Sequence, residues 1–79
     1  MQIHVTAYDI MDGIRGDGRS CPIARAIVRE LEEEVLILIG ESSMYIRRVK
    51  YKLPDVCKDF IQRFDNGLSV NPFVFDFDI

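Results

Sequence analysis

The sequence is poor in the side chains on which most catalytic sites depend. Its 79 residues include one histidine, His4, and two cysteines, Cys21 and Cys57. A catalytic site needs a nucleophile with a base, a metal or paired titratable groups, and no such set is recognisable. Two cysteines this far apart form no disulfide scaffold, and a reducing compartment keeps them as thiols. We therefore expect a protein without enzymatic activity, cofactor or metal, whose cysteines pack as small hydrophobic residues.

Long apolar runs and an excess of positive charge are also missing. The amino terminus MQIHVTAYD lacks the basic region and apolar stretch of a signal peptide, and no apolar run reaches the length of a membrane span. The formal net charge is -3, whereas dedicated polyanion binders carry a strong basic excess. These absences predict a cytoplasmic protein that uses no membrane and is not a dedicated nucleic-acid binder.

The sequence does contain enough apolar side chains for one core. Hydrophobic residues make up 48% and charged residues 29% of the chain, which is ordinary globular usage. A chain of this length supports one domain rather than two. We expect a single α+β domain over residues 1–79, folding alone or as a dimer.

Short local signals predict the elements of the first twenty residues. Residues 2–6 alternate between apolar and polar side chains, as in a half-buried strand. Thr6 followed by Asp9 predicts a short helix that ends at Gly13. The three glycines of residues 13–20 predict a mobile surface loop.

The middle of the chain predicts a helix followed by a hairpin. A proline in the first turn and apolar residues at helical spacing predict a helix over residues 21–33. The branched apolar run 35–39 is typical of a central strand that is covered on both faces. Residues 44–51 alternate and predict a third strand, paired with the second through a turn at 40–43.

The C-terminal third predicts a second helix and a last strand. Pro54 at the first helical position and Gly67 past the end frame the helix. Its predicted buried stripe is Val56, Cys57, Phe60, Ile61 and Phe64. Residues 73–79 alternate strictly, with Phe73, Phe75, Phe77 and Ile79 on one side. The resulting order β, α, β, β, α, β predicts a ferredoxin-like fold, a four-stranded antiparallel sheet with two helices on one face, plus the short extra helix after the first strand.

Four stretches carry a resemblance: IHVTAYDIMDGIRGD, CPIARAI, YKLPDVCKDFIQRFDNG and VNPFVFDF. Together they resemble a group of short uncharacterised proteins encoded by bacteriophages and bacterial genomes. The resemblance implies a phage or mobile-element context. It implies no activity or ligand.

Three weaker signals have simpler structural explanations. Asp9, Asp12 and Asp17 offer oxygen ligands, but their spacing is not that of a calcium loop, so we favour caps and turns. Backbone amides of residues 16–20 could cradle an anion, but the segment lacks a phosphate-binding lysine, which favours a flexible turn. Cys21 at a helix start could be reactive, but packing is the commoner role.

The strongest polar feature is an alternation of aromatic and basic residues along strand 45–52. Its candidate binding residues are Tyr45, Arg47, Arg48, Lys50 and Tyr51. Sheets that stack bases show this pattern, and in a single strand Tyr45, Arg47 and Tyr51 would share a face. Against nucleic acid stand the acidic total, the acidic residues of the last strand, and the use of charged edge strands to block aggregation.

These observations predict a small noncovalent protein-binding module that acts on a host or viral protein. The exposed sheet or the alternating tail could also pair across a symmetric homodimer. A nucleic-acid-binding domain that uses strand 45–52 is the alternative.

Overall fold

The computed structural model describes residues 1–32 and 35–78, which contain three helices and five strands. In chain order they are β1 (Gln2–Val5), α1 (Ala7–Asp12), α2 (Pro22–Leu31), β2 (Ile37–Ile39), β3 (Ser43–Ile46), β4 (Val49–Lys52), α3 (Asp55–Asp65) and β5 (Phe73–Asp76). The α+β class and the short helix after the first strand are therefore confirmed. Two predicted elements end earlier than expected: α2 ends at Leu31, with Glu32 in the left-handed region, and β5 ends at Asp76. The predicted ends at residues 33 and 79 themselves lie outside the described residues.

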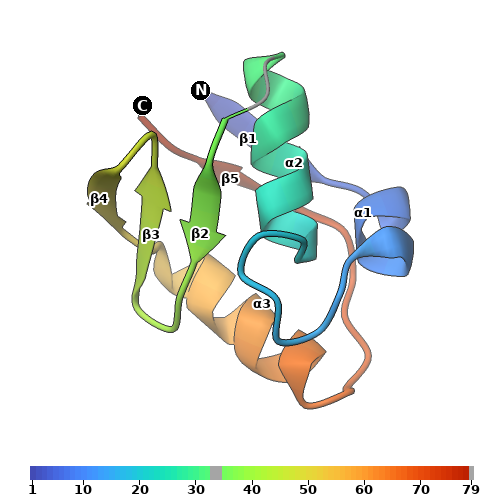
Figure 1. The fold of residues 1–79 in the computed structure, drawn as a ribbon. Helices are drawn as coiled ribbons and strands as arrows, with labels where there is room; N and C mark the ends of the chain where they lie inside the picture. The colour runs from blue at the N-terminus through green and yellow to red at the C-terminus, as the bar shows by residue number, and fades with distance from the viewer. Residues whose placement is uncertain (33–34, 79) are drawn as a thin grey trace.

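The strands form two antiparallel sheets instead of one. In the part of the chain that the structure describes, β1 pairs with β5, while β2, β3 and β4 form a three-stranded sheet in that order. Figure 1 shows α2 in front of β1 and β5, with the three-stranded sheet to one side and α3 below. The predicted four-stranded sheet with two helices on one face is wrong, because β5 pairs with β1 and with no other described strand.

The predicted strand 44–51 is a hairpin. Arg47 and Arg48 have φ angles of 54° and 68°, and positive φ at both central residues is the geometry of a tight two-residue hairpin turn. The chain reverses there, so Ile46 pairs with Val49 and Met44 pairs with Tyr51. The sequence did not predict this turn, because such turns usually contain asparagine, aspartate or glycine, whereas here both central residues are arginine.

The core lies between the two sheets and the longer helices. Its members are Ile3, Val5, Cys21, Ile23, Ala24, Ala26, Ile27, Ile37, Ile39, Met44, Ile46, Leu53, Cys57, Phe60, Phe64 and Phe75. The predicted burial of both cysteines is confirmed. In α3, however, Val56 is 48% exposed and Ile61 only partly buried, so the buried stripe of this helix is narrower than predicted.

A buried carboxylate joins the first strand to two helices. Asp9 is 1% exposed and closes a capping box with Thr6, whose backbone N–H donates to the carboxylate at 2.8 Å. Arg29 of α2 donates to both oxygens of Asp9, at 2.6 and 2.9 Å, and also to the His4 carbonyl at 2.6 Å. Burial by itself raises the pKa of Asp9, but the hydrogen bonds from Arg29 and Thr6 and the Arg29 charge outweigh burial, so its pKa is lowered.

Candidate binding surface

The structure separates the five predicted binding residues. Tyr45 pairs with Lys50 on the solvent side of the sheet, opposite the face that carries buried Met44 and Ile46. Tyr51 pairs with Met44 and therefore belongs to the inner face. The expectation that Tyr45, Arg47 and Tyr51 share a face is wrong, because the turn at residues 47–48 shifts the alternation.

The two tyrosines consequently have different surroundings. Tyr51 packs edge-on against Phe77, with ring centroids 5.0 Å apart. Tyr45 is 40% exposed and lies opposite Leu38 of β2. The Arg47 backbone N–H donates to the Leu36 carbonyl at 3.1 Å, which ties the turn to the chain before β2. Only one tyrosine of the predicted site therefore faces solvent on the outer side.

A shallow cavity surrounds this tyrosine. Its volume is about 290 Å³ and its lining residues, here called the Tyr45 patch, are Arg19, Leu36, Leu38, Tyr45 and Arg48. Leu36 and Leu38 are 53% and 44% exposed. The patch combines three large apolar side chains with two guanidinium groups, and none of its described lining residues is acidic.

Sequence reasoning missed Leu36, Leu38 and Arg19. The apolar run 35–39 indicated a strand covered on both faces, but β2 has the burial pattern buried, exposed, buried. No described helix or strand covers its outer side in Figure 1. Arg19 follows the glycines of a loop that was expected to be mobile. One feature of the sequence did indicate the turn. The apolar residues Met44 and Ile46 stand at even positions, whereas Val49 and Tyr51 stand at odd positions, so the alternation shifts between them.

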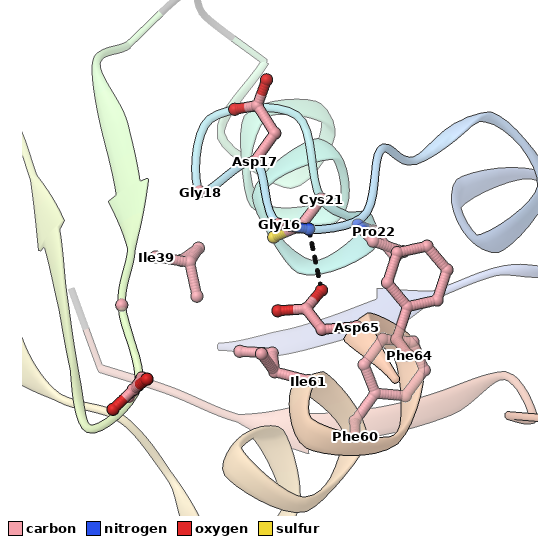
Figure 2. A pocket seen from close by; sticks show the side chains of 12 residues that line it. Gly16, Asp17, Gly18, Cys21, Pro22, Ile39, Phe60, Ile61, Phe64 and Asp65 are labelled. Atoms are coloured by element: carbon pink, nitrogen blue, oxygen red, sulfur yellow. Dashed lines mark hydrogen bonds between the residues drawn. The ribbon is translucent and has the colours of Figure 1, made fainter. Parts of the chain in front are cut away.

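A second cavity lies under the glycine-rich loop, as Figure 2 shows. Its volume is about 230 Å³, and its floor consists of apolar side chains of α2, β2 and α3. Asp17, Glu41 and Asp65 are its acidic lining residues. The Gly16 N–H donates to Asp65 at 3.0 Å, and the Arg19 N–H donates to Asp17 at 2.9 Å. These amides are thus already used by carboxylates, which argues against an anion cradle.

The loop itself is anchored at both sides, and its expected mobility stays a prediction. Arg15 donates from Nε to the Phe64 carbonyl at 3.0 Å and lies 5.7 Å from the centre of the Phe64 ring. On the other side, the Ile39 N–H donates to the Gly18 carbonyl at 2.8 Å. A Cβ on Gly18 would lie 2.5 Å from the Ile39 carbonyl oxygen. Glycine is needed here because the loop backbone touches the strand.

The remaining candidate groups have structural partners. Arg25 lies 3.6 Å from Asp12, and Asp9 is held by Arg29. Within residues 1–32 and 35–78, no three metal-ligating side chains converge. Burial raises the pKa of Cys21 and raises that of Cys57 to about 12, so at neutral pH both thiols remain protonated and weakly nucleophilic.

Comparison with protein family models, with curated protein sequences and with solved structures found no match. The resemblance to short phage and bacterial proteins therefore stays a prediction. No helix of the described residues has the length and apolar character required to cross a membrane.

Proposed function

We propose that this protein is a noncovalent protein-binding module without catalytic activity, and that the Tyr45 patch is its contact surface. The observation that carries the proposal is the exposure of Leu36, Leu38 and Tyr45 on one side of the sheet. These side chains contribute little to the core, so folding does not explain why they are apolar. Tyrosine and arginine around an apolar centre are enriched at protein interfaces.

The charges around the patch favour an acidic partner. Arg19 and Arg48 line it, and exposed Lys50 lies next to Tyr45 on the adjacent strand. The chain as a whole carries a formal charge of -3, so this positive character is local. A partner surface with an apolar group ringed by carboxylates would match it, and complementary charge would speed association. In the phage or mobile-element context implied by the resemblance, the partner would be a host or viral protein in the cytoplasm.

Nucleic acid is the less favoured partner. Proteins that stack successive bases use several exposed aromatic rings, and Tyr51 is engaged with Phe77 on the inner side. Asp76 belongs to the other sheet, although Phe77, which follows it, packs against Tyr51 of the basic strand. The deficit of exposed aromatic side chains on the outer face is what favours a protein partner.

A peptide-display selection tests this proposal with a defined probe. A random peptide library is selected on the immobilised protein, and enriched peptides are titrated against wild type, Tyr45→Ala and the matched control Val74→Ala. Val74 is 48% exposed but lies in the β1–β5 sheet. We expect acidic peptides with apolar anchors that bind at least about tenfold more weakly to Tyr45→Ala, as for an interface hot spot, and equally to Val74→Ala.

Two outcomes would overturn the proposal. One is that the selected peptides bind Tyr45→Ala as tightly as wild type. The other is tight binding of single-stranded DNA or RNA with a steep decrease as salt increases, which is the signature of phosphate contacts.

A further inference from the structure

The two edges of the three-stranded sheet differ in their accessibility. At the β2 edge, the glycine-rich loop occupies the place of a neighbouring strand, because Gly18 accepts a hydrogen bond from the Ile39 N–H. At the opposite edge, no described strand pairs with β4 beyond its partner β3. Figure 1 shows β4 at the outer margin of the molecule. Within the part of the chain that the structure describes, an additional strand could therefore join this sheet alongside β4.

The turn geometry determines which backbone groups of β4 face outward. In an antiparallel hairpin with a two-residue turn, the residues that flank the turn exchange both backbone hydrogen bonds, and alternate pairs do the same. Here the flanking pair is Ile46 and Val49, and Tyr51 follows as the next bonded residue of β4. The N–H and C=O groups of Lys50 and Lys52 consequently point away from β3. They form a short row of donors and acceptors at an exposed edge.

The charges on this edge disfavour a second copy as the occupant. A two-fold pairing of β4 with itself centred on Lys50 sets Lys50 opposite its own copy, and one centred on Tyr51 sets Lys50 opposite Lys52. Like charges directly opposite each other destabilise a strand pair. The same lysines would attract glutamate or aspartate on a strand from a different protein.

The core-facing side of β4 determines which side chains an added strand needs on that same face. Val49 lies on the same face as buried Ile46 but is 51% exposed, because no described strand flanks it on the side away from β3. An apolar side chain on a neighbouring strand would cover Val49. Side chains alternate between the two faces of a strand, so the fitting segment carries apolar residues toward the core side and acidic residues toward Lys50 and Lys52.

We infer that β4 receives an extended, alternately apolar and acidic segment of a partner protein as a fourth strand. This inference rests on the proposed function, since it specifies how the partner lies beside the Tyr45 patch. The binding mode is strand addition, in which main-chain hydrogen bonds supply affinity and alternate side chains supply specificity.

The test uses a short capped peptide of alternating Val and Glu and the full chain labelled with ¹⁵N. We expect the peptide to slow amide hydrogen exchange at Lys50 and Lys52 and to leave Val49 and Tyr51, which already bond to β3, largely unchanged. A peptide N-methylated at the amides that face β4 should lose this effect and bind at least about tenfold more weakly, because it lacks the donors.

Charge reversal supplies the second arm. Lys50→Glu combined with Lys52→Glu should weaken the peptide about tenfold or more, since attractive cross-strand pairs become repulsive. The control is Lys58→Glu with Arg63→Glu on α3, which changes net charge equally away from the edge, at one partly buried and one exposed position. Equal affinity for both double variants would overturn the inference.

The outcomes separate this inference from the proposed function. If Tyr45→Ala weakens binding of the Val-Glu peptide but N-methylation of that peptide does not, the partner lies on the sheet face and strand addition is wrong. If N-methylation abolishes binding while Tyr45→Ala has no effect, strand addition stands and the Tyr45 patch is not the contact surface. If the peptide leaves exchange at Lys50 and Lys52 unchanged, the edge does not bind such a segment.

Discussion

The two sheets of this protein bury similar inner faces and expose different outer faces. On the β1–β5 sheet, Ile3, Val5 and Phe75 are buried, and the outward residues are Gln2, His4, Val74 and Asp76. On the three-stranded sheet, Ile37, Ile39, Met44 and Ile46 are buried, and the outward residues include Leu38, Tyr45 and Lys50. One outer face is mostly polar with an acidic residue, and the other is apolar and basic.

This difference distinguishes the side chains that folding requires from the side chains that are available for binding. A half-exposed antiparallel sheet needs apolar side chains on its inner face only. The β1–β5 sheet follows that rule closely, with one outward valine. The three-stranded sheet departs from it at Leu38 and Tyr45, joined by exposed Leu36 just before β2, and Arg19 and Arg48 lie beside these apolar side chains. This contrast between the two sheets is the reason to propose that the partner binds the three-stranded sheet.

The largest expected effect tests whether the inner faces are equivalent. Phe75→Ala should destabilise the protein by about 3–5 kcal/mol and Met44→Ala by about 2–5 kcal/mol, because each empties a buried site. Phe75 is 5% exposed and Met44 0%. Urea unfolding measures both changes. An unchanged midpoint for either variant would mean that its sheet is not packed as described.

The next effect concerns a polar anchor of the β1–β5 sheet. Asp9→Asn should cost about 1–3 kcal/mol at pH 7, because it removes charged hydrogen bonds to Arg29. Since folding lowers the pKa of Asp9, its ionisation stabilises the protein above the unfolded pKa of about 3.9, and this contribution is lost as pH falls through the folded value.

The pH dependence supplies the check on that prediction. Unfolding free energies of wild type and Asp9→Asn, measured from pH 7 down to pH 2, should converge below about pH 4. A constant difference across this range would contradict the ionic role of Asp9.

A smaller effect probes the closed edge of the three-stranded sheet. Gly18→Ala should cost about 1–3 kcal/mol, because its Cβ would lie 2.5 Å from the Ile39 carbonyl oxygen and backbone must move. Gly40→Ala is the control, since its nearest contact is 3.2 Å. Amide exchange at Ile39 should accelerate in Gly18→Ala only. Equal behaviour of the two variants would show that the loop does not hold this edge.

The smallest stability effect is expected on the outer faces. Tyr45→Ala and Val74→Ala should each change the unfolding free energy by no more than about 1 kcal/mol, because both side chains are 40–48% exposed. Their effects on the selected peptides should nevertheless differ, with loss for Tyr45→Ala alone. A large destabilisation by Tyr45→Ala would assign this residue to the fold instead of to binding.

The sequence predicted a helix or strand well where residues only a few positions apart determine it. The capping pair Thr6 and Asp9 marks α1, and the alternation of residues 73–79 marks β5. The turn at Arg47 and Arg48 escaped because an alternating pattern continues through it, with only a change of parity. That single change moved Tyr51 from the predicted site to the inner face, and it left Tyr45, Arg48 and Lys50 near the outer one.

By itself, the sequence determined the α+β class, the helix start at Thr6, the buried cysteines and the alternation of the last strand. These features depend on residues a few positions apart. Only the tertiary structure decided that the tail joins β1, that the glycine-rich loop closes one sheet edge, and that Leu36 and Leu38 gather around Tyr45. Such pairings join segments up to about seventy residues apart in register, for instance Gln2 with Asp76. Periodicity specifies which side chains share a face of one strand, whereas the neighbour of that strand depends on packing across the whole core.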